Sequence, residues 1–188
     1  MTIEQLLEAV RLKELPRAGW VRQGLHHPES VAGHSWGVAW LVLALLPDEL
    51  DQTRALTYAV LHDLPEVRVG DLTPHDLIPR EEKARREQAA MHGLTAGTDR
   101  GTRLARLWEA YEDQTDPEAQ FVRQLDRLDM ALQAVHYAER QPQRRDDLVE
   151  FLTSAAKVIE HPTLVPLLEA LKRRLTAVAP PVPATERE

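Results

Sequence analysis

Apolar residues recur along most of this chain at steps of three and four, which is the spacing of one face of an α-helix. Near the N-terminus, Ile3, Leu6, Leu7 and Val10 follow this spacing among charged residues, as in an amphipathic helix. The sequence contains no clear period-two alternation and no internal repeat. The pattern therefore predicts an all-α fold in a single domain.

Capping and helix-breaking residues set the boundaries of the predicted helices. Ser30 is suited to cap a helix that continues to about Leu46, where Pro47 ends it. The segment 69–79 contains glycine, aspartate and two prolines, which predicts a loop. The predicted helices are 2–14, 30–46, 51–64, 80–94, 101–113, 117–139, 144–159 and 163–177. We expect the domain to cover residues 1–177 and the proline-rich stretch 178–188 to be disordered.

Composition narrows the class of protein. With 188 residues and 43% hydrophobic content, the chain can bury a real core in one domain. It contains no cysteine, which excludes a disulfide scaffold and any cysteine-based zinc site or nucleophile. We find no apolar core of a secretory signal and no run near the ~18 apolar residues that span a membrane. A cytoplasmic protein without a membrane partner is therefore expected.

The net charge of −7 is spread along the chain, mostly as alternating signs. This balance argues against a general nucleic-acid binder, which usually carries a basic face. A small anionic substrate is still compatible with it, because a bound metal and one or two arginines can reverse the field locally.

Ionisable residues interrupt the buried faces of three predicted helices. His34 lies on the apolar line that begins at Val31, and His62 and Asp63 end the buried half of helix 51–64. Asp126 lies at the edge of the apolar stripe of helix 117–139. Because ionisable side chains are seldom buried without a partner or a metal, these four positions need a common explanation.

Two histidines and two aspartates suit one divalent transition metal such as Co, Mn, Zn, Fe or Ni, whose bound water can become a nucleophile. Each residue also has a simpler interpretation. A lone histidine on an apolar face is usually hydrogen-bonded within the core, Asp129 competes with Asp126 for the same role, and Glu66 could merely end its helix. These interpretations need a separate partner for every buried group, which favours the shared metal.

The order H…HD…D on helices resembles the HD-domain metal-dependent phosphohydrolases. The stretch LKELPRAGWVRQGLHHPESVAGHSWGVA is similar to the opening of the HD-domain 5′-deoxynucleotidase family. The runs LHDLPEVRVGDLTPHDLIPREEKARREQAAM and LWEAYEDQTDPEAQFVRQLDRLDMALQA are similar to its core motif and its third block. The similarity extends from about Leu12 to about Ala170 and implies an HD-domain helical bundle.

The resemblance also implies roles for single residues. It makes four residues the metal ligands: His34, His62, Asp63 and Asp126. It makes Glu66 the catalytic glutamate, and it assigns Asp71 to the sugar and to catalysis.

Trp20 matches a tryptophan that packs on the deoxyribose, and Arg17 matches the phosphate-binding arginine. Here the chain departs from some members, because Ala18 and Gly19 separate the arginine from the tryptophan. Pro65 is a second unusual feature, since a proline in mid-helix would kink the chain and swing Glu66 off the line from His62.

The implied activity is that of a metal-dependent 5′-deoxyribonucleotidase, which releases phosphate from deoxyribonucleoside 5′-monophosphates. One alternative is an HD phosphohydrolase for an alarmone or a nucleoside triphosphate, which would need a larger and more basic pocket. Another is a catalytically silent metal- or nucleotide-binding module, which the intact H…HD…D set with Glu66 disfavours. Family members are often homodimers, and the C-terminal amphipathic stretch LVPLLEALKRRL offers a face for such an assembly.

Overall fold

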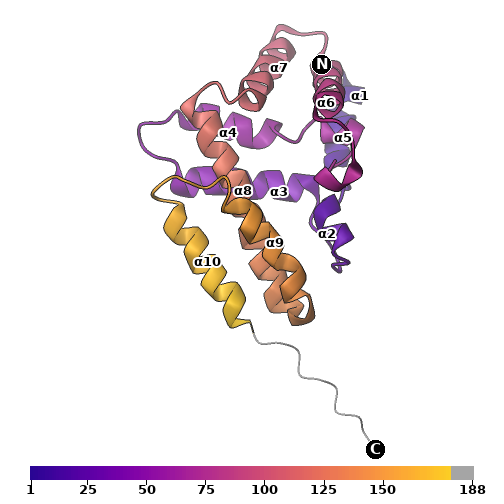
Figure 1. Cartoon of the computed structure of the whole chain (residues 1–188). Helices are drawn as coiled ribbons and strands as arrows, with labels where there is room; N and C mark the ends of the chain where they lie inside the picture. The colour runs from indigo at the N-terminus through magenta and orange to yellow at the C-terminus, as the bar shows by residue number, and fades with distance from the viewer. Residues whose placement is uncertain (179–188) are drawn as a thin grey trace, which may run out of the picture. The chain divides into compact units, whose positions relative to one another are not determined.

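Every regular element in the computed structural model, which describes residues 1–178, is a helix (Figure 1). The α-helices are α1 (Ile3–Val10), α2 (Ala18–Arg22), α3 (Val31–Leu45), α4 (Gln52–Leu61), α5 (Glu66–Val69), α6 (Arg80–Thr95), α7 (Asp99–Glu112), α8 (Pro117–Arg140), α9 (Arg145–Ala155) and α10 (Val165–Ala177). Three 3₁₀ turns join them: η1 (Arg11–Lys13), η2 (Pro74–Asp76) and η3 (Pro142–Arg144). The all-α prediction is confirmed, and the predicted disorder of the tail falls on 179–188, outside the described residues.

The chain divides into two compact units, Met1–Asp126 and Arg127–Glu188. The first unit holds α1 to α7 and the beginning of α8, and the second holds the rest of α8 with α9 and α10. In the second unit, α9 and α10 pack against each other. No helix among residues 1–178 is both long and apolar enough to cross a membrane.

Helix α3 begins and ends where the sequence predicts. The Ser30 hydroxyl accepts a hydrogen bond from the backbone N–H of Gly33 at 3.1 Å, which satisfies one of the free donors at the helix start. The helix ends at Leu45, before Pro47. His34 and its apolar neighbours on the predicted line are buried, and α3 packs along α4 (Figure 1).

The predicted helix 51–64 is too long at its C-terminal end. Helix α4 stops at Leu61, a turn follows, and α5 begins at Glu66 with Pro65 immediately before it. The expected mid-helix kink is therefore wrong, because a proline just before a helix interrupts no intrahelical hydrogen bond. The predicted buried line through Val60 is also wrong, since Val60 is exposed.

Packing among α4, α6 and α7 holds the turn after α4 in place. Leu61, Met91, Ala105 and Trp108 form a buried apolar cluster that joins these helices. The indole N–H of Trp108 donates to the backbone carbonyl of His62 at 3.1 Å. The turn that carries the His-Asp pair is thus fixed from behind by a buried aromatic ring.

Candidate metal centre and active site

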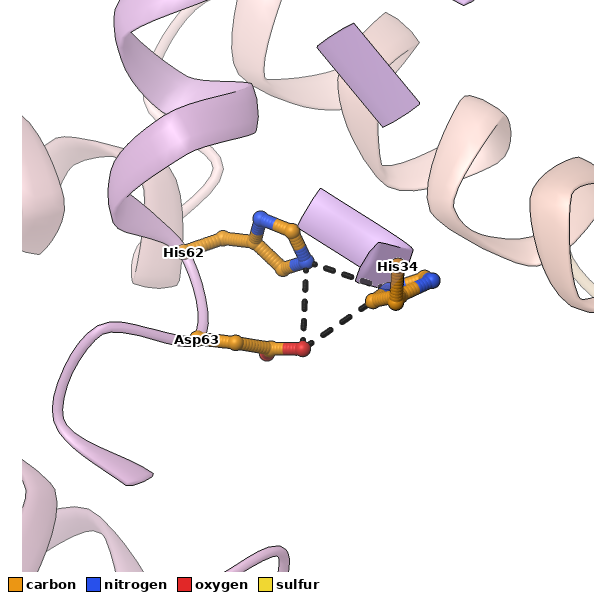
Figure 2. Close-up of side chains that lie close together, drawn as sticks. All are labelled: His34, His62 and Asp63. Carbon is orange, nitrogen blue, oxygen red and sulfur yellow. Dashed lines mark hydrogen bonds and ion pairs between the residues drawn. The ribbon is translucent and has the colours of Figure 1, made fainter. Parts of the chain in front are cut away.

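Three predicted metal ligands meet in the first unit (Figure 2). His34 comes from α3, and His62 and Asp63 come from the turn after α4. The two histidine Nε2 atoms lie 3.3 Å apart, and the Asp63 Oδ2 lies 3.3 Å from His62 Nε2 and 3.7 Å from His34 Nε2. These atoms satisfy the spacing of a candidate metal site.

Asp126 completes the set from α8. Its Oδ1 lies 3.2 Å from His34 Nε2, and its side chain is largely covered. Ligand atoms that surround a metal at ~2.1 Å lie roughly 3.0–3.4 Å from one another in octahedral or tetrahedral sites, which is the range found here. The prediction that Asp126 faces His34 is confirmed, and its competitor Asp129 falls in the second unit.

The chemistry of the histidines also fits a cation. His62 Nδ1 lies 2.9 Å from the backbone carbonyl of Ala59, which can only accept, so Nδ1 carries a proton. In the neutral ring, Nε2 then presents its lone pair toward Nε2 of His34. A cation bound between two such nitrogens and two carboxylates removes their mutual repulsion, so the donor set suits a divalent metal.

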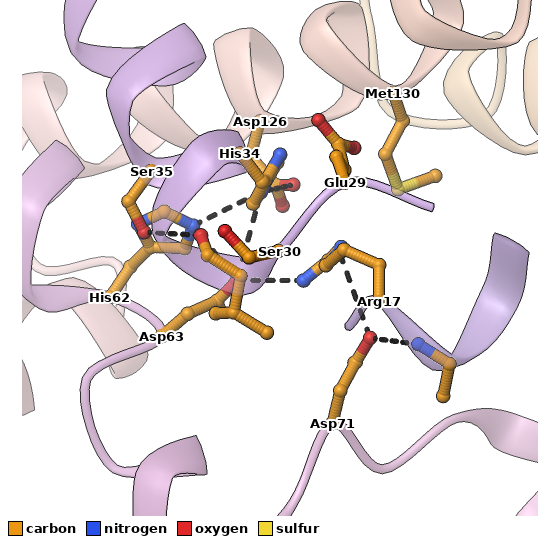
Figure 3. Close-up of polar contacts among 12 residues, drawn as sticks. Arg17, Glu29, Ser30, His34, Ser35, His62, Asp63, Asp71, Asp126 and Met130 are labelled. Carbon is orange, nitrogen blue, oxygen red and sulfur yellow. Dashed lines mark hydrogen bonds and ion pairs between the residues drawn. The ribbon is translucent and has the colours of Figure 1, made fainter. Parts of the chain in front are cut away.

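Arg17 approaches the same cluster from the segment before α2 (Figure 3). Its Nη1 donates to Asp63 Oδ2 at 2.7 Å, and its Nε lies 3.6 Å from Asp71 Oδ2. The backbone explains this position: Arg17 N–H donates to the Glu29 carbonyl at 3.0 Å, beside an isolated antiparallel bridge between Pro16 and Ser30. The arginine is therefore anchored next to the start of α3.

The charges at the centre shift several pKa values. Burial alone would raise the pKa of Asp63, but the positive charges of His62 and Arg17 outweigh it and hold that pKa well below its usual value. Burial likewise lowers the pKa of Arg17, yet the charges of Asp63 and Asp71 raise it overall. Both residues therefore stay ionised across the physiological range.

Glu66 behaves in the opposite way. It is 5% exposed, and its Oε2 is buried without a hydrogen-bond partner among the described residues. Burial raises the pKa of Glu66 well above its ordinary value, and the negative charges of Asp63 and Asp71 raise it further. A buried carboxyl with a free oxygen beside a metal-type cluster is suited to accept or hold a proton.

Asp71 and Trp20 also lie in this region, each held by a specific contact. Asp71 Oδ2 accepts the backbone N–H of Ala18 at 2.7 Å, which ties the loop after α5 to the start of α2. Trp20 is 1% exposed, and its indole N–H donates to Glu29 Oε1 at 2.8 Å. The ring is thus covered, and its role at a sugar stays a prediction.

Two neighbouring residues were not predicted from the sequence. Glu29 binds both the Trp20 indole and, through its carbonyl, the backbone of Arg17. Lys83 Nζ donates to the backbone carbonyl of Leu72 at 3.1 Å, which fixes the loop that carries Asp71. Neither interrupts an apolar stripe, so periodicity gives no signal for them.

Comparison with known proteins agrees with this geometry. A family model described as "HD domain" matches residues 9–164. The chain is 41% identical over 174 residues to a human protein named 5′-deoxynucleotidase HDDC2, covering 90% of this chain and 84% of that one. It is 37% identical to 5′-deoxynucleotidase hdd1 of Schizosaccharomyces pombe, covering 81% of this chain and 79% of the other.

A solved structure gives the same result at the level of the fold. The crystal structure of PH0347 protein from Pyrococcus horikoshii OT3 superposes with a TM-score of 0.76 and 30% identity, over 92% of this chain and 99% of that one. The matched region includes every residue of the candidate centre. This chain therefore belongs to the HD domain family.

Proposed function

We propose that this protein is a metal-dependent 5′-deoxynucleotidase, which hydrolyses deoxyribonucleoside 5′-monophosphates to deoxyribonucleosides and phosphate. The observation that carries the proposal is the cluster of His34, His62, Asp63 and Asp126 with the guanidinium of Arg17 beside it. Such a site joins cation ligands to a phosphate-binding charge. The names of the relatives, at about 40% identity over most of the chain, support the same activity.

The four residues are proposed to hold one divalent transition metal, which can be Co, Mn, Zn, Fe or Ni. When bound, such an ion supplies Lewis acidity to a water molecule and to the phosphoryl oxygens. His62 presents Nε2 for this purpose because Ala59 fixes its proton on Nδ1. The two aspartates offset the charge of the ion.

Arg17 is proposed to bind the phosphate. Its guanidinium offers more donors than the Asp63 and Asp71 contacts occupy, and a planar fork matches phosphate oxygens well. Neutralising the phosphoryl charge in this way favours the transition state of phosphate transfer. The separation of Arg17 from Trp20 by two residues does not prevent this, because the backbone contact to Glu29 sets the approach of the arginine.

Glu66 and Asp71 are proposed to move protons. The buried Oε2 of Glu66 would accept a proton from the attacking water and orient that water toward phosphorus. Asp71, or a water next to it, would deliver a proton to the leaving 5′-oxygen. Trp20, held by Glu29, is proposed to form part of the rigid wall against which a sugar lacking a 2′-hydroxyl fits.

The test is phosphate release by chelator-stripped protein supplied with single metals. Deoxyribonucleoside monophosphates should be hydrolysed, ribonucleoside monophosphates more slowly, and activity should depend on the added metal. Preference for nucleoside triphosphates or alarmones would instead favour another HD phosphohydrolase. Absence of turnover with every substrate and metal, despite metal binding, would indicate a silent binding module.

The cellular setting follows from the substrate. Because nucleotides are small metabolites of the cytoplasm, we propose that location and no nucleic-acid partner, in line with the net charge of −7. A homodimer is also proposed.

A further inference from the structure

Helix α1 turns its apolar stripe away from the protein. Ile3, Leu6, Leu7 and Val10 are 62%, 48%, 61% and 51% exposed, and α1 has no buried residue. The sequence pattern predicts an amphipathic helix here, and α1 is one. Its apolar face, however, is not part of the core, and a contiguous exposed apolar patch of this kind usually marks an interaction surface.

Specific contacts on the polar face fix this orientation. The Gln5 side-chain amide donates to the Gly93 carbonyl at 2.9 Å in α6. Glu8 accepts two hydrogen bonds from Arg68 in α5, each of 2.8 Å, in a forked pair. Leu12, one turn farther along, is buried. The polar side of α1 is therefore anchored to α5 and α6, which leaves the apolar side facing outward.

We propose that this face docks against the same face of a second copy of the chain, with the two α1 helices antiparallel. Spacing at 3, 6, 7 and 10 is that of a coiled-coil seam, which needs an equally apolar helix opposite. A twofold axis supplies one, because the same patch then meets itself. Leu6 and Leu7 would lie at the centre, with Ile3 near the partner's Val10.

The charges that flank the seam fit this arrangement. Glu4 and Arg11 lie two helical turns apart on one flank of the stripe, and both are exposed. In an antiparallel twofold pair, equal flanks meet, so Glu4 faces the partner's Arg11 and Arg11 faces the partner's Glu4. An anionic lipid surface is a poorer match, since the protein carries a net charge of −7 and this flank is balanced.

The size of the patch sets the expected strength. One short helix from each copy corresponds to the small end of specific interfaces, below ~1,200 Å² in total. We therefore expect a reversible dimer with a dissociation constant in the micromolar range rather than a permanent one. This inference does not depend on the proposed activity, because its test measures mass and not turnover.

The first experiment is sedimentation velocity on the full chain across ~1–200 µM, the range that brackets weak association. Wild-type protein should shift from monomer to dimer as its concentration rises. Leu7→Glu should raise the dissociation constant by at least ~10-fold, because it places charge in the seam. The matched control Leu167→Glu, at an exposed site of α10, should dimerise normally, and circular dichroism checks that both variants fold.

A charge exchange then tests the antiparallel pairing. Glu4→Arg and Arg11→Glu should each weaken the dimer, and the double variant should restore it. A monomer throughout the wild-type series, or a dimer that Leu7→Glu leaves unchanged, would overturn the proposal. So would binding of monomeric wild type to phosphatidylserine vesicles that Leu7→Glu abolishes. Failure of the double variant to recover would overturn the antiparallel arrangement.

Discussion

At the scale of single residues, Glu66 differs from the other carboxylates of the centre because one of its oxygens is buried without a hydrogen-bond partner among the described residues. It is not among the atoms whose spacing suits a metal. Glu66→Ala should therefore leave metal content and fold intact while turnover falls by roughly 10²–10⁴-fold, the usual effect of removing a positioned acid or base. The KM should change little, because other groups hold the phosphate.

Metal analysis and steady-state kinetics on the purified variant check this prediction. Glu66→Gln is a useful companion, because it keeps the shape of the side chain but cannot take a proton at neutral pH. It should be as inactive as Glu66→Ala. Near-normal turnover in both variants would sink the catalytic assignment, and joint loss of metal and turnover would make Glu66 a ligand.

Glu29 makes a second prediction at this scale. Its carboxylate accepts the indole N–H of Trp20, a residue that is almost wholly buried. Glu29→Ala leaves that donor unsatisfied, which should cost about 1–3 kcal/mol and lower the melting temperature. Glu29→Gln retains an acceptor oxygen at the same place and should lose much less. Equal melting temperatures for the two variants would show that the contact contributes nothing, and differential scanning fluorimetry resolves the difference.

At the scale of elements, the long helices were predictable and the short ones were not. Helix α3 has a cap, an apolar line and a terminating proline within the sequence itself. Helices α2 and α5 are five and four residues long, and such helices have too few internal hydrogen bonds to form alone. They depend on distant contacts such as the one between Ala18 N–H and Asp71, which no local pattern reports.

The start of α8 carries a prediction about pH. Asp116 Oδ1 accepts the N–H of Ala119 at 2.8 Å, and its Oδ2 accepts from the Tyr58 hydroxyl at 2.5 Å and from Arg54 at 2.9 Å. Partial burial opposes ionisation, but these hydrogen bonds outweigh it and lower the pKa of Asp116. The aspartate therefore joins a helix cap to a tertiary contact with α4.

Because the folded-state pKa of Asp116 lies below its unfolded value of ~3.9, its contribution is complete above that value and lost as the pH falls through the folded pKa. Asp116→Asn should reduce the free energy of unfolding by about 1 kcal/mol at pH ~6. The difference should shrink below pH ~4. Urea titrations across this range test it, with exposed Asp113→Asn as the control. A difference independent of pH would show that ionisation of Asp116 is not its source.

At the scale of the whole molecule, the candidate centre joins segments that are far apart in the sequence. The sequence could predict His34, His62, Asp63 and Asp126, because each interrupts or ends a helix with strong apolar periodicity. It could not predict how Arg17 reaches them. That position depends on the pairing of residues 15–17 with 29–31, which is a long-range backbone contact. Nor could it predict that α1 faces outward, since an apolar stripe does not reveal what covers it.

Because all four proposed ligands lie in the unit Met1–Asp126, metal binding should stabilise that unit. A ligand that binds only the folded state at about 100 times its dissociation constant adds ~2.7 kcal/mol to the free energy of unfolding. Chelation should therefore lower the melting temperature, and adding Mn or Co back should restore it. Asp63→Asn removes one of two negative charges from the centre, so its melting temperature should respond weakly to metal and its activity should be lost.

Asp129→Asn is the matched control, because Asp129 lies on the same helix as Asp126 but outside this unit. It should keep the full metal-dependent rise in melting temperature, whereas Asp126→Asn should lose most of it. Calorimetry with metal titration, together with metal analysis, measures these shifts. If Asp129→Asn lost the response and Asp126→Asn kept it, the ligand from α8 would be Asp129. If Asp63→Asn bound metal fully but did not turn over, Asp63 would act on the substrate rather than on the ion.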